Sequence, residues 1–367
     1  MKFTDIFEDV TKQGTKIPTN LYLESGMYPI IDQGQSQIAG YTDQTEGLFI
    51  DVPAIIFGDH TRIIKYVDTP CFLGADGVKL LKAKDPTANY KYLYYALCNA
   101  DIPNTGYNRH FKWLKEIEIP ECSIEEQNSI VAQLEKIDTL ISLRKQQLSK
   151  LDELVKSRFV EMFGDPVHNP MRWKIETLKK ATAKIGSGAT PKGGKESYQT
   201  EGITLIRSMN VHDGRFEYKD LAHITDEQAK QLDNVTVEEN DVFINITGAS
   251  VARSCIVPKH ILPARVNQHV AIIRCITAML NPVFANQMFL NTSFKGQLLD
   301  IGESGGATRQ AITKQQLETL LVILPPLELQ KQFAAFVEQI DKSKIEIQKS
   351  LEKLETLKKA LMQKYFG

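Results

Sequence analysis

Apolar residues recur at alternating spacings of four and three positions along two long segments, 124–164 and 327–367. The first series is Ile130, Leu134, Ile137, Ile141, Leu148, Leu151, Val155 and Met162, and the second is Phe333, Val337, Ile340, Ile347, Leu351, Leu354, Leu361 and Tyr365. This spacing places one apolar stripe along a helix, as in a coiled-coil seam. Prolines precede each segment, and Gly164 is a typical helix stop. We therefore expect two long helices.

The two segments are copies of each other. Aligned without a gap at a shift of 203 residues, they share 13 identities over 41 positions, and both end in Phe-Gly. Because neither helix can bury its stripe alone, we expect the two to pack as an antiparallel coiled coil with pseudo-two-fold symmetry. The alternative is an oligomerisation coiled coil, but an intramolecular pair already satisfies both seams.

The regions ahead of the helices, 1–123 and 165–326, contain short β-prone runs broken by Gly, Asp and Asn. They also share an order of features: residues 26–31 correspond to 202–207, 54–58 to 243–248, 77–81 to 269–273, and 106–110 to 306–310. The predicted fold class is therefore α+β. Two β-rich domains, 1–123 and 165–326, alternate with two repeated helices, 124–164 and 327–367.

Bulk composition is that of a globular protein, with 42% apolar and 24% charged residues in 367. The sequence has neither an apolar run long enough to span a membrane nor a signal peptide, so we expect a cytoplasmic protein. The five cysteines include no CxxC pair, which favours reduced thiols over a zinc site or a disulfide framework.

The net charge of −1 is unusual for a protein that binds nucleic acid on its own. Residues 1–123 carry 12 Lys and Arg against 16 Asp and Glu, whereas residues 165–323 carry 18 against 16. If the chain holds DNA, a local basic surface or a basic partner must supply much of the attraction to phosphates.

The loops of both domains are rich in side chains that can read base edges, since Arg pairs with guanine and Asn or Gln with adenine. In the first domain we single out Gln33, Gln35, Gln37, His60, Arg62, Asn108, Arg109, His110 and Lys112. In the second we single out Thr190, Lys192, Lys195, Arg207, Asn210, Thr247, Ser250, Arg253, Thr308, Arg309 and Gln310. Arg109 and Arg309 stand out because they occupy corresponding positions.

Two variable domains thus alternate with repeated helices that begin at "IPECSIEEQ" and "LPPLELQ" and end in "FG", and the second domain opens with "GSGATPKGG". Over essentially the whole chain, this layout resembles the specificity subunit of type I restriction-modification systems. The resemblance implies two target-recognition domains, each reading one half of a bipartite, asymmetric DNA sequence. It also implies that the helices set the spacing and dock two methyltransferase subunits, with restriction subunits joining them. One departure is that the first domain is shorter and has no counterpart of residues 186–192.

Motifs for catalysis are weak. Asn281-Pro282-Val283-Phe284 only partly matches the adenine methyltransferase motif, and residues 188–195 only partly match a phosphate-binding loop. The histidines stand singly, without metal-ligand spacing. We therefore expect a non-catalytic chain without a cofactor or metal. Two other interpretations stay open: a β-rich adaptor that binds proteins, and the detached recognition half of a fused restriction–methylation enzyme.

Overall fold

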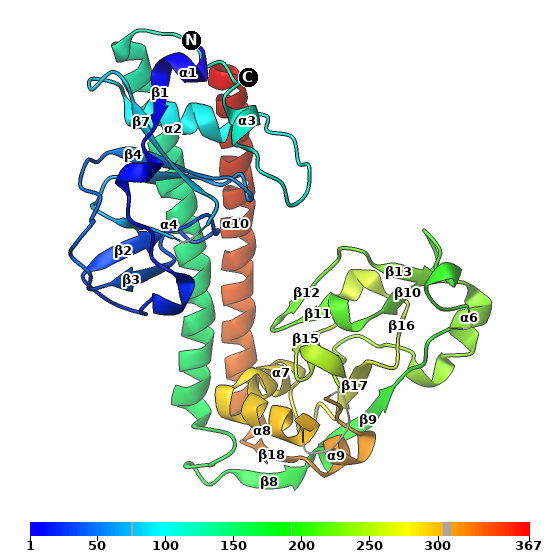
Figure 1. Cartoon of the computed structure of the whole chain (residues 1–367). Coiled ribbons are helices and arrows are strands. Elements are labelled where there is room, and N and C mark those ends of the chain that lie inside the picture. Colours follow the sequence, from blue (N-terminus) through cyan, green and yellow to red (C-terminus); the bar gives the residue numbers. More distant parts are fainter. Residues whose placement is uncertain (75, 192, 304–309) are drawn as a thin grey trace. The chain divides into compact units, whose positions relative to one another are not determined.

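The computed structural model describes residues 1–74, 76–191, 193–303 and 310–367, without the side chains of residues 195 and 197. Two 40-residue helices dominate it, α4 (Ile124–Phe163) and α10 (Leu327–Phe366), and Figure 1 shows them side by side. Ser123 and Glu126 form a capping box that starts α4, because the Ser123 hydroxyl accepts from Glu126 N and the Glu126 carboxylate accepts from Ser123 N. Gly164, at φ +73°, follows the end of α4.

The chain divides into two compact units, and each contains part of both helices. One unit comprises Met1–Gln146 and Gln348–Gly367, and the other comprises Gln147–Ile347. In the first unit the helices are joined by the ion pairs Lys145–Glu355 (3.2 Å) and Asp138–Lys358 (2.6 Å). In the second, Lys344 pairs with Asp152. Since residue numbers rise along one helix as they fall along the other, the predicted antiparallel pairing is confirmed.

In the first unit, a four-stranded antiparallel sheet has the strand order β1-β7-β4-β5. Its strands are β1 (Phe7–Asp9), β7 (Val78–Ala83), β4 (Ala54–Gly58) and β5 (Ile64–Val67). A second sheet, β3-β2-β6, joins β2 (Tyr28–Ile31) antiparallel to β3 (Gly40–Thr42) and parallel to β6 (Phe72–Leu73). The helices of this domain are α1 (Phe3–Ile6), α2 (Tyr90–Cys98) and α3 (Phe111–Leu114).

The second unit repeats both sheets. The order β15-β14-β17-β9 corresponds to β5-β4-β7-β1, and β13-β10-β16 corresponds to β3-β2-β6. These strands are β15 (Ser254–Ile256), β14 (Val242–Asn245), β17 (Val270–Cys275), β9 (Thr182–Ser187), β13 (Ala222–Ile224), β10 (Ile203–Ile206) and β16 (Ala264–Val266). One short pair is added, β11 (Val211–His212) with β12 (Arg215–Phe216). A second pair, β8 (Lys174–Thr177) with β18 (Leu321–Leu324), is the longer counterpart of the bridge between Lys2 and Glu118 in the first unit. The helices are α5 (Leu178–Ala181), α6 (Asp226–Lys230), α7 (Pro282–Leu290), α8 (Thr292–Glu303) and α9 (Lys314–Thr319).

In each four-stranded sheet one inner strand, β4 in the first unit and β14 in the second, is buried on both faces. Burial on both faces explains the unbroken apolar sequence of these strands. In β4, Ile55 and Phe57 belong to one hydrophobic cluster, whereas Ala54 and Ile56 belong to another. In the same way Val242 and Ile244 of β14 face one cluster while Phe243 faces another. Each sheet is therefore anchored between two hydrophobic clusters, and the loops that follow β4 and β14 start from this anchored part of the domain.

The ends of the long helices are part of the domain cores. Phe163 lies edge-on to Phe284 of α7, with 4.7 Å between ring centroids, and Phe366 lies 5.2 Å from Tyr92 of α2. Phe163 and Phe366 occupy the same position of the repeat. The motif beginning at Asn281 also has a structural role, since its side chain accepts from Val283 N and Phe284 N and caps α7.

Among the described residues, no helix is both long and apolar enough to cross a membrane. All five cysteines carry free thiols. Burial raises the pKa of the Cys71 thiol to about 11 and that of Cys255 to about 12.

Candidate nucleic-acid interface

In the first domain, four loops meet at the carboxyl end of β4. The Gln33 side chain, on the loop that follows β2, ties together the loops of His60 and Asp76, accepting from His60 N (3.2 Å) and donating to Asp76 O (3.1 Å). The His60 ring contacts the fourth loop, with Nδ1 3.2 Å from Asn108 O. Three predicted residues, Gln33, His60 and Asn108, are therefore brought together.

An exposed aromatic residue that sequence reasoning missed lies on this surface. The Tyr107 ring is stacked on the ring of His60, with 4.6 Å between centroids and 7° between planes, although its residue is 86% exposed. An aromatic residue within the polar run 104–110 was the available signal. A flat, exposed ring of this kind can stack on a base or pack against a sugar.

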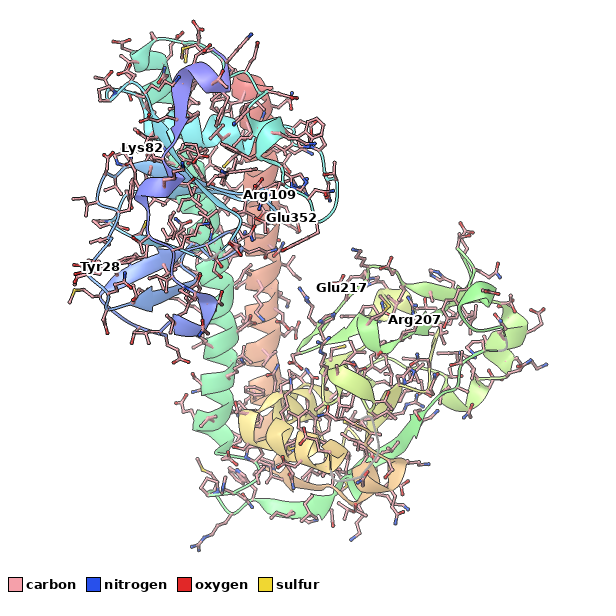
Figure 2. All side chains as sticks on the ribbon, in the orientation of Figure 1. Tyr28, Lys82, Arg109, Arg207, Glu217 and Glu352 are labelled. Carbon is pink, nitrogen blue, oxygen red and sulfur yellow. The ribbon has the colours of Figure 1, made fainter. Side chains whose placement is uncertain are left out.

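Two arginines of the first domain differ in how they are held. Arg62, at φ 63°, donates from Nη1 to Ile102 O (3.1 Å) and braces the loop that contains Asn108. Arg109, labelled in Figure 2, is exposed. Its guanidinium makes no hydrogen bond or ion pair with any described residue. It is consequently available for an external ligand. Gln35 is also exposed, and the Lys112 ammonium lies over the ring of Trp113 at 4.7 Å.

The structure corrects the prediction that His110 contacts DNA. Its ring is fully buried, with Nδ1 2.9 Å from Asp59 O. Asp59, also buried, accepts from Phe111 N through its carboxylate (2.7 Å). A side chain without exposed surface cannot reach a base edge. His110 therefore holds its loop in place and does not contact DNA.

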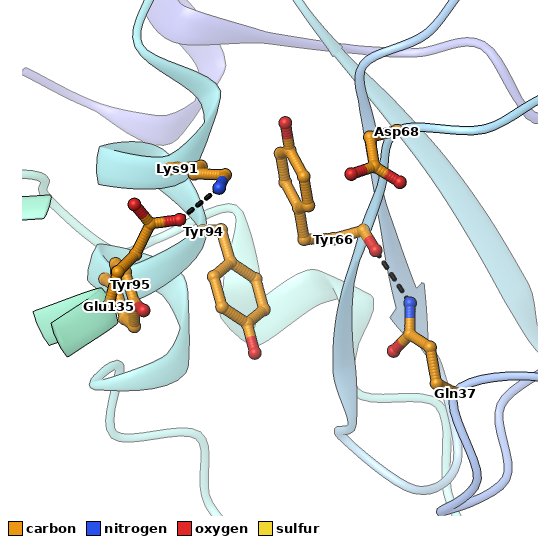
Figure 3. Close-up of a pocket in the computed structure, with 7 residues that line it drawn as sticks. All are labelled: Gln37, Tyr66, Asp68, Lys91, Tyr94, Tyr95 and Glu135. Atoms are coloured by element: carbon orange, nitrogen blue, oxygen red, sulfur yellow. Dashed lines mark hydrogen bonds and ion pairs between the residues drawn. The ribbon is translucent and has the colours of Figure 1, made fainter. Parts of the chain in front are cut away.

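Gln37 lies farther along the loop that contains Gln33, at a pocket of about 330 Å³ (Figure 3). Its amide donates to Tyr66 O (2.7 Å), and on the opposite wall Lys91 forms an ion pair with Glu135 of α4. Burial raises the pKa of the Tyr66 hydroxyl. The pocket is therefore lined both by residues of the first domain and by Glu135 of the long helix α4.

In the second domain, four predicted residues gather around one groove of about 570 Å³. They are Thr247, Ser250, Arg253 and Gln310. The groove is also lined by Ser208 and by five residues that sequence reasoning missed, Met209, Gly248, Ala249, His269 and Ala311. The groove lies beyond the carboxyl end of β14, where Gly248 N donates to Gln310 O (2.9 Å). The sites of both domains thus follow the corresponding central strand.

Thr190 is connected to this groove through Gln268. Its hydroxyl lies 2.6 Å from the Gln268 side-chain oxygen, and the Gln268 nitrogen lies 2.9 Å from Nε2 of His269. The predicted residues Lys192, Thr308 and Arg309 lie outside the described residues, as does the side chain of Lys195.

Arg207 and Asn210 have partners within the domain. The Arg207 guanidinium donates to Asp220 O and lies over the Tyr198 ring at 5.4 Å. Asn210 is fully buried, accepting from Arg207 N (3.1 Å) and donating to Glu217 O (3.0 Å). Asn210 therefore stabilises a turn, and the prediction that it contacts DNA is corrected in the same way as that for His110.

Among the described residues, no group of three His, Cys, Asp or Glu side chains is arranged to hold a metal ion. Both candidate surfaces instead offer hydrogen-bonding groups and guanidinium groups on loops near the ends of β4 and β14. Such groups bind base edges and phosphates without performing a reaction.

Comparison with known proteins identifies the family to which the chain belongs. The sequence matches the family described as the type I restriction modification DNA specificity domain over residues 1–153 and 173–359. It is 22% identical over 347 residues to the EcoR124I/EcoR124II specificity subunit of Escherichia coli, covering 87% of this chain and 81% of that protein. It is 26% identical over 270 residues to the MjaIX specificity subunit of Methanocaldococcus jannaschii, covering 68% and 60%. The alignments with the M. jannaschii relatives therefore span less than two thirds of those proteins.

A crystal structure of the S subunit of a type I restriction-modification system from M. genitalium has a similar fold. Its TM-score is 0.60 at 17% identity, and the alignment covers 100% of this chain and 95% of that one. A chain from a study of complex assembly and conformational transition of the type I R-M system aligns with a TM-score of 0.53 at 18% identity, again covering 100% and 95%. Because the family match includes both domains and most of both long helices, the chain belongs to the type I restriction-modification DNA specificity family.

Proposed function

We propose that this chain selects the DNA target of a type I restriction-modification complex, and that each of its two domains reads one half of a bipartite, asymmetric site. The supporting observation is the equivalent placement of the two candidate surfaces. One follows β4 with Arg109 exposed beside it, and the other follows β14 with Arg253 in its groove. We assign target recognition to residues 1–123 and 165–326 and spacing to 124–164 and 327–367.

Specificity subunits of type I systems assemble with methyltransferase and restriction subunits and bind DNA. For this chain we propose that two methyltransferase subunits dock on the long helices and that restriction subunits join them. The net charge of −1 supports a shared interface, because affinity for DNA rises with the number of phosphates that are neutralised. The partners would supply most of those contacts, and this chain would supply the choice of sequence.

Specificity-family membership supports a chain without catalytic activity. The surfaces contain the groups that such a role requires, namely the Arg109 guanidinium in one domain and Thr247 with Arg253 in the other. Methyl transfer and cleavage would then take place on partner subunits, and no cofactor would bind here.

A domain exchange tests the proposal. Residues 165–326 are replaced by the same region of a relative with a known target, and the methylated motif is read from the genome of cells that express the assembled complex. We expect one half of the motif to change while the other half is retained. The unaltered chain and the reciprocal exchange of residues 1–123 are the controls. A motif in which both halves change, or neither does, contradicts the assignment.

A further inference from the structure

The groove of the second domain is bordered by a chain of hydrogen bonds that crosses three neighbouring strands. Thr190 follows β9, Gln268 and His269 precede β17, and Thr247 follows β14. Since β17 lies between β14 and β9 and is antiparallel to both, its start meets the ends of the other two. The topology therefore brings all four side chains to one edge.

The chemistry of these groups gives the chain a direction. A carboxamide oxygen only accepts hydrogen bonds and its nitrogen only donates them. The Thr190 hydroxyl must consequently donate to Gln268 Oε1 (2.6 Å), and Gln268 Nε2 must donate to Nε2 of His269 (2.9 Å). With Nε2 as the acceptor, a neutral His269 carries its proton on Nδ1.

The proton on Nδ1 determines what Thr247 can offer to a ligand. Nδ1 lies 2.5 Å from the Thr247 hydroxyl oxygen, so the imidazole donates and that oxygen accepts. The hydroxyl proton of Thr247 is then left for another partner, and accepting a hydrogen bond makes the hydroxyl a stronger donor. Thr247 and His269 both line the groove. Thr247 therefore presents a donor there.

Other groove residues complement this donor. Arg253 has only donor groups, and its guanidinium makes no hydrogen bond or ion pair within the described part of the chain. Gln310 donates to Glu303 (2.7 Å), which leaves its side-chain oxygen as an acceptor. Guanine presents two neighbouring acceptors, N7 and O6, in the major groove, and its paired cytosine presents an amino donor.

We propose that this groove reads a G·C base pair, with Thr247 and Arg253 donating to guanine, and that Gln268 and His269 are positioning residues that hold Thr247 as a donor. This inference rests on the proposed role in DNA recognition. It assigns base choice to the polarity of a hydrogen-bond chain, so a change in His269 alters specificity through the Thr247 hydroxyl.

The test uses the complete chain assembled with its methyltransferase partner, on duplexes carrying the motif found by genome methylation. Each base pair of the half-site read by the second domain is replaced in turn by the other three, and binding affinities are compared. We expect one position at which the unaltered complex prefers guanine by about ten-fold or more, the discrimination typical of a specific contact. Thr247→Val and His269→Phe should reduce the preference at that position alone.

Controls separate positioning from stability. Thr247→Ser keeps the hydroxyl and should restore much of the preference, whereas Thr236→Val removes a hydroxyl that bonds to Asp233 O away from the groove and should change nothing. Nitrogen-15 spectra of His269 should show a proton on Nδ1.

The inference is overturned if Thr247→Val and His269→Phe weaken all sequences equally, if guanine is not preferred, or if Nε2 carries the proton. Sequence-specific binding that is indifferent to both variants overturns this inference alone, whereas absence of specific binding by the unaltered complex overturns the proposed function as well.

Discussion

Gln127 and Gln330 occupy the same position of the two repeated helices, and each donates from its side-chain nitrogen to a carbonyl that precedes its helix. The acceptors are Cys122 O at 3.1 Å and Pro325 O at 2.8 Å. Gln330 makes two further bonds, accepting from Asn281 N (2.8 Å) and donating to Met279 O (3.1 Å). The glutamine of the repeated entry sequence therefore fastens each long helix to the chain leading into it.

This difference between the two glutamines predicts unequal effects on stability. Gln330 is fully buried, so Gln330→Ala leaves three backbone groups without a partner and should lower the free energy of unfolding by about 2–4 kcal/mol. Gln127 is partly exposed, and Gln127→Ala should cost about 1 kcal/mol or less. Urea unfolding followed by circular dichroism measures both. Equal costs would show that the extra bonds of Gln330 contribute nothing.

The architecture was largely predictable because periodicity and an internal repeat do not depend on distant contacts. The helical stripe, however, proved wider than the coiled-coil pattern at the ends of the helices. Val131, Phe159 and Met362 are buried there although they lie outside the predicted series. Their burial follows from packing against the domains, and a pattern for two helices alone cannot include that contact.

The candidate site was predictable only in part. Polar residues in loops look alike in sequence whether they face solvent or satisfy the backbone, which is why the sequence predicts DNA contacts for His110 and Asn210 although both are buried. His269 was missed for the opposite reason, since its importance depends on strands β14 and β9 meeting the start of β17. Thr247 and Arg253 were found because they belong to loops rich in hydrogen-bonding groups.

Arg109 and His110 are neighbours with opposite predicted phenotypes. Arg109→Ala should leave the unfolding free energy within about 0.5 kcal/mol of the unaltered chain, because the side chain is exposed and unpaired among the described residues. It should relax one position of a half-site, or weaken binding to all sequences if the contact is to phosphate. His110→Ala should instead lower stability by about 2–4 kcal/mol.

Thermal unfolding and affinity for the target duplex, measured on both variants in the assembled complex, distinguish these roles. Arg62→Ala is a useful comparison, since Arg62 braces the loop through Ile102 O and should affect both quantities. If Arg109→Ala destabilises the protein as much as His110→Ala does, Arg109 is structural and its assignment to DNA contact is wrong.

Asp165 predicts a pH-dependent contribution to stability. Partial burial raises its pKa, but hydrogen bonds from Ser293, His168 and Val167 outweigh that effect and lower the pKa from 3.8 to about 2. A lowered pKa stabilises the folded state by about 2 kcal/mol at neutral pH. The contribution is complete above about pH 5 and is lost as the pH falls through 4 towards 2.

The measurement compares the unaltered chain with Asp165→Ala in urea at pH 7, 5, 4 and 3. The difference in unfolding free energy should be constant between pH 7 and 5 and shrink at pH 4 and 3. Glu201→Ala, at an exposed position, controls for the general loss of negative charge. A difference that does not vary with pH would mean that the Asp165 pKa is not lowered in the folded protein.

The proposed spacing role of the helices predicts how their length affects the DNA target. Seven residues inserted between Gln146 and Gln147 preserve the apolar repeat and add about 10 Å of helix. The pairing requires the same insertion between Ile347 and Gln348, because an insertion in α4 alone would shift either the contact of Lys145 with Glu355 or that of Asp152 with Lys344. With both helices lengthened, the gap between the half-sites should grow by about three base pairs, at roughly 3.4 Å each. Methylation motifs of cells expressing the variant measure this gap directly. The half-sites themselves should be unchanged, because neither domain is altered.

Two residues inserted at the same two points rotate the apolar stripe of each helix away from its partner, so that variant should fail to assemble. A longer helical pair that still methylates the original spacing would show that something other than the helices sets the distance.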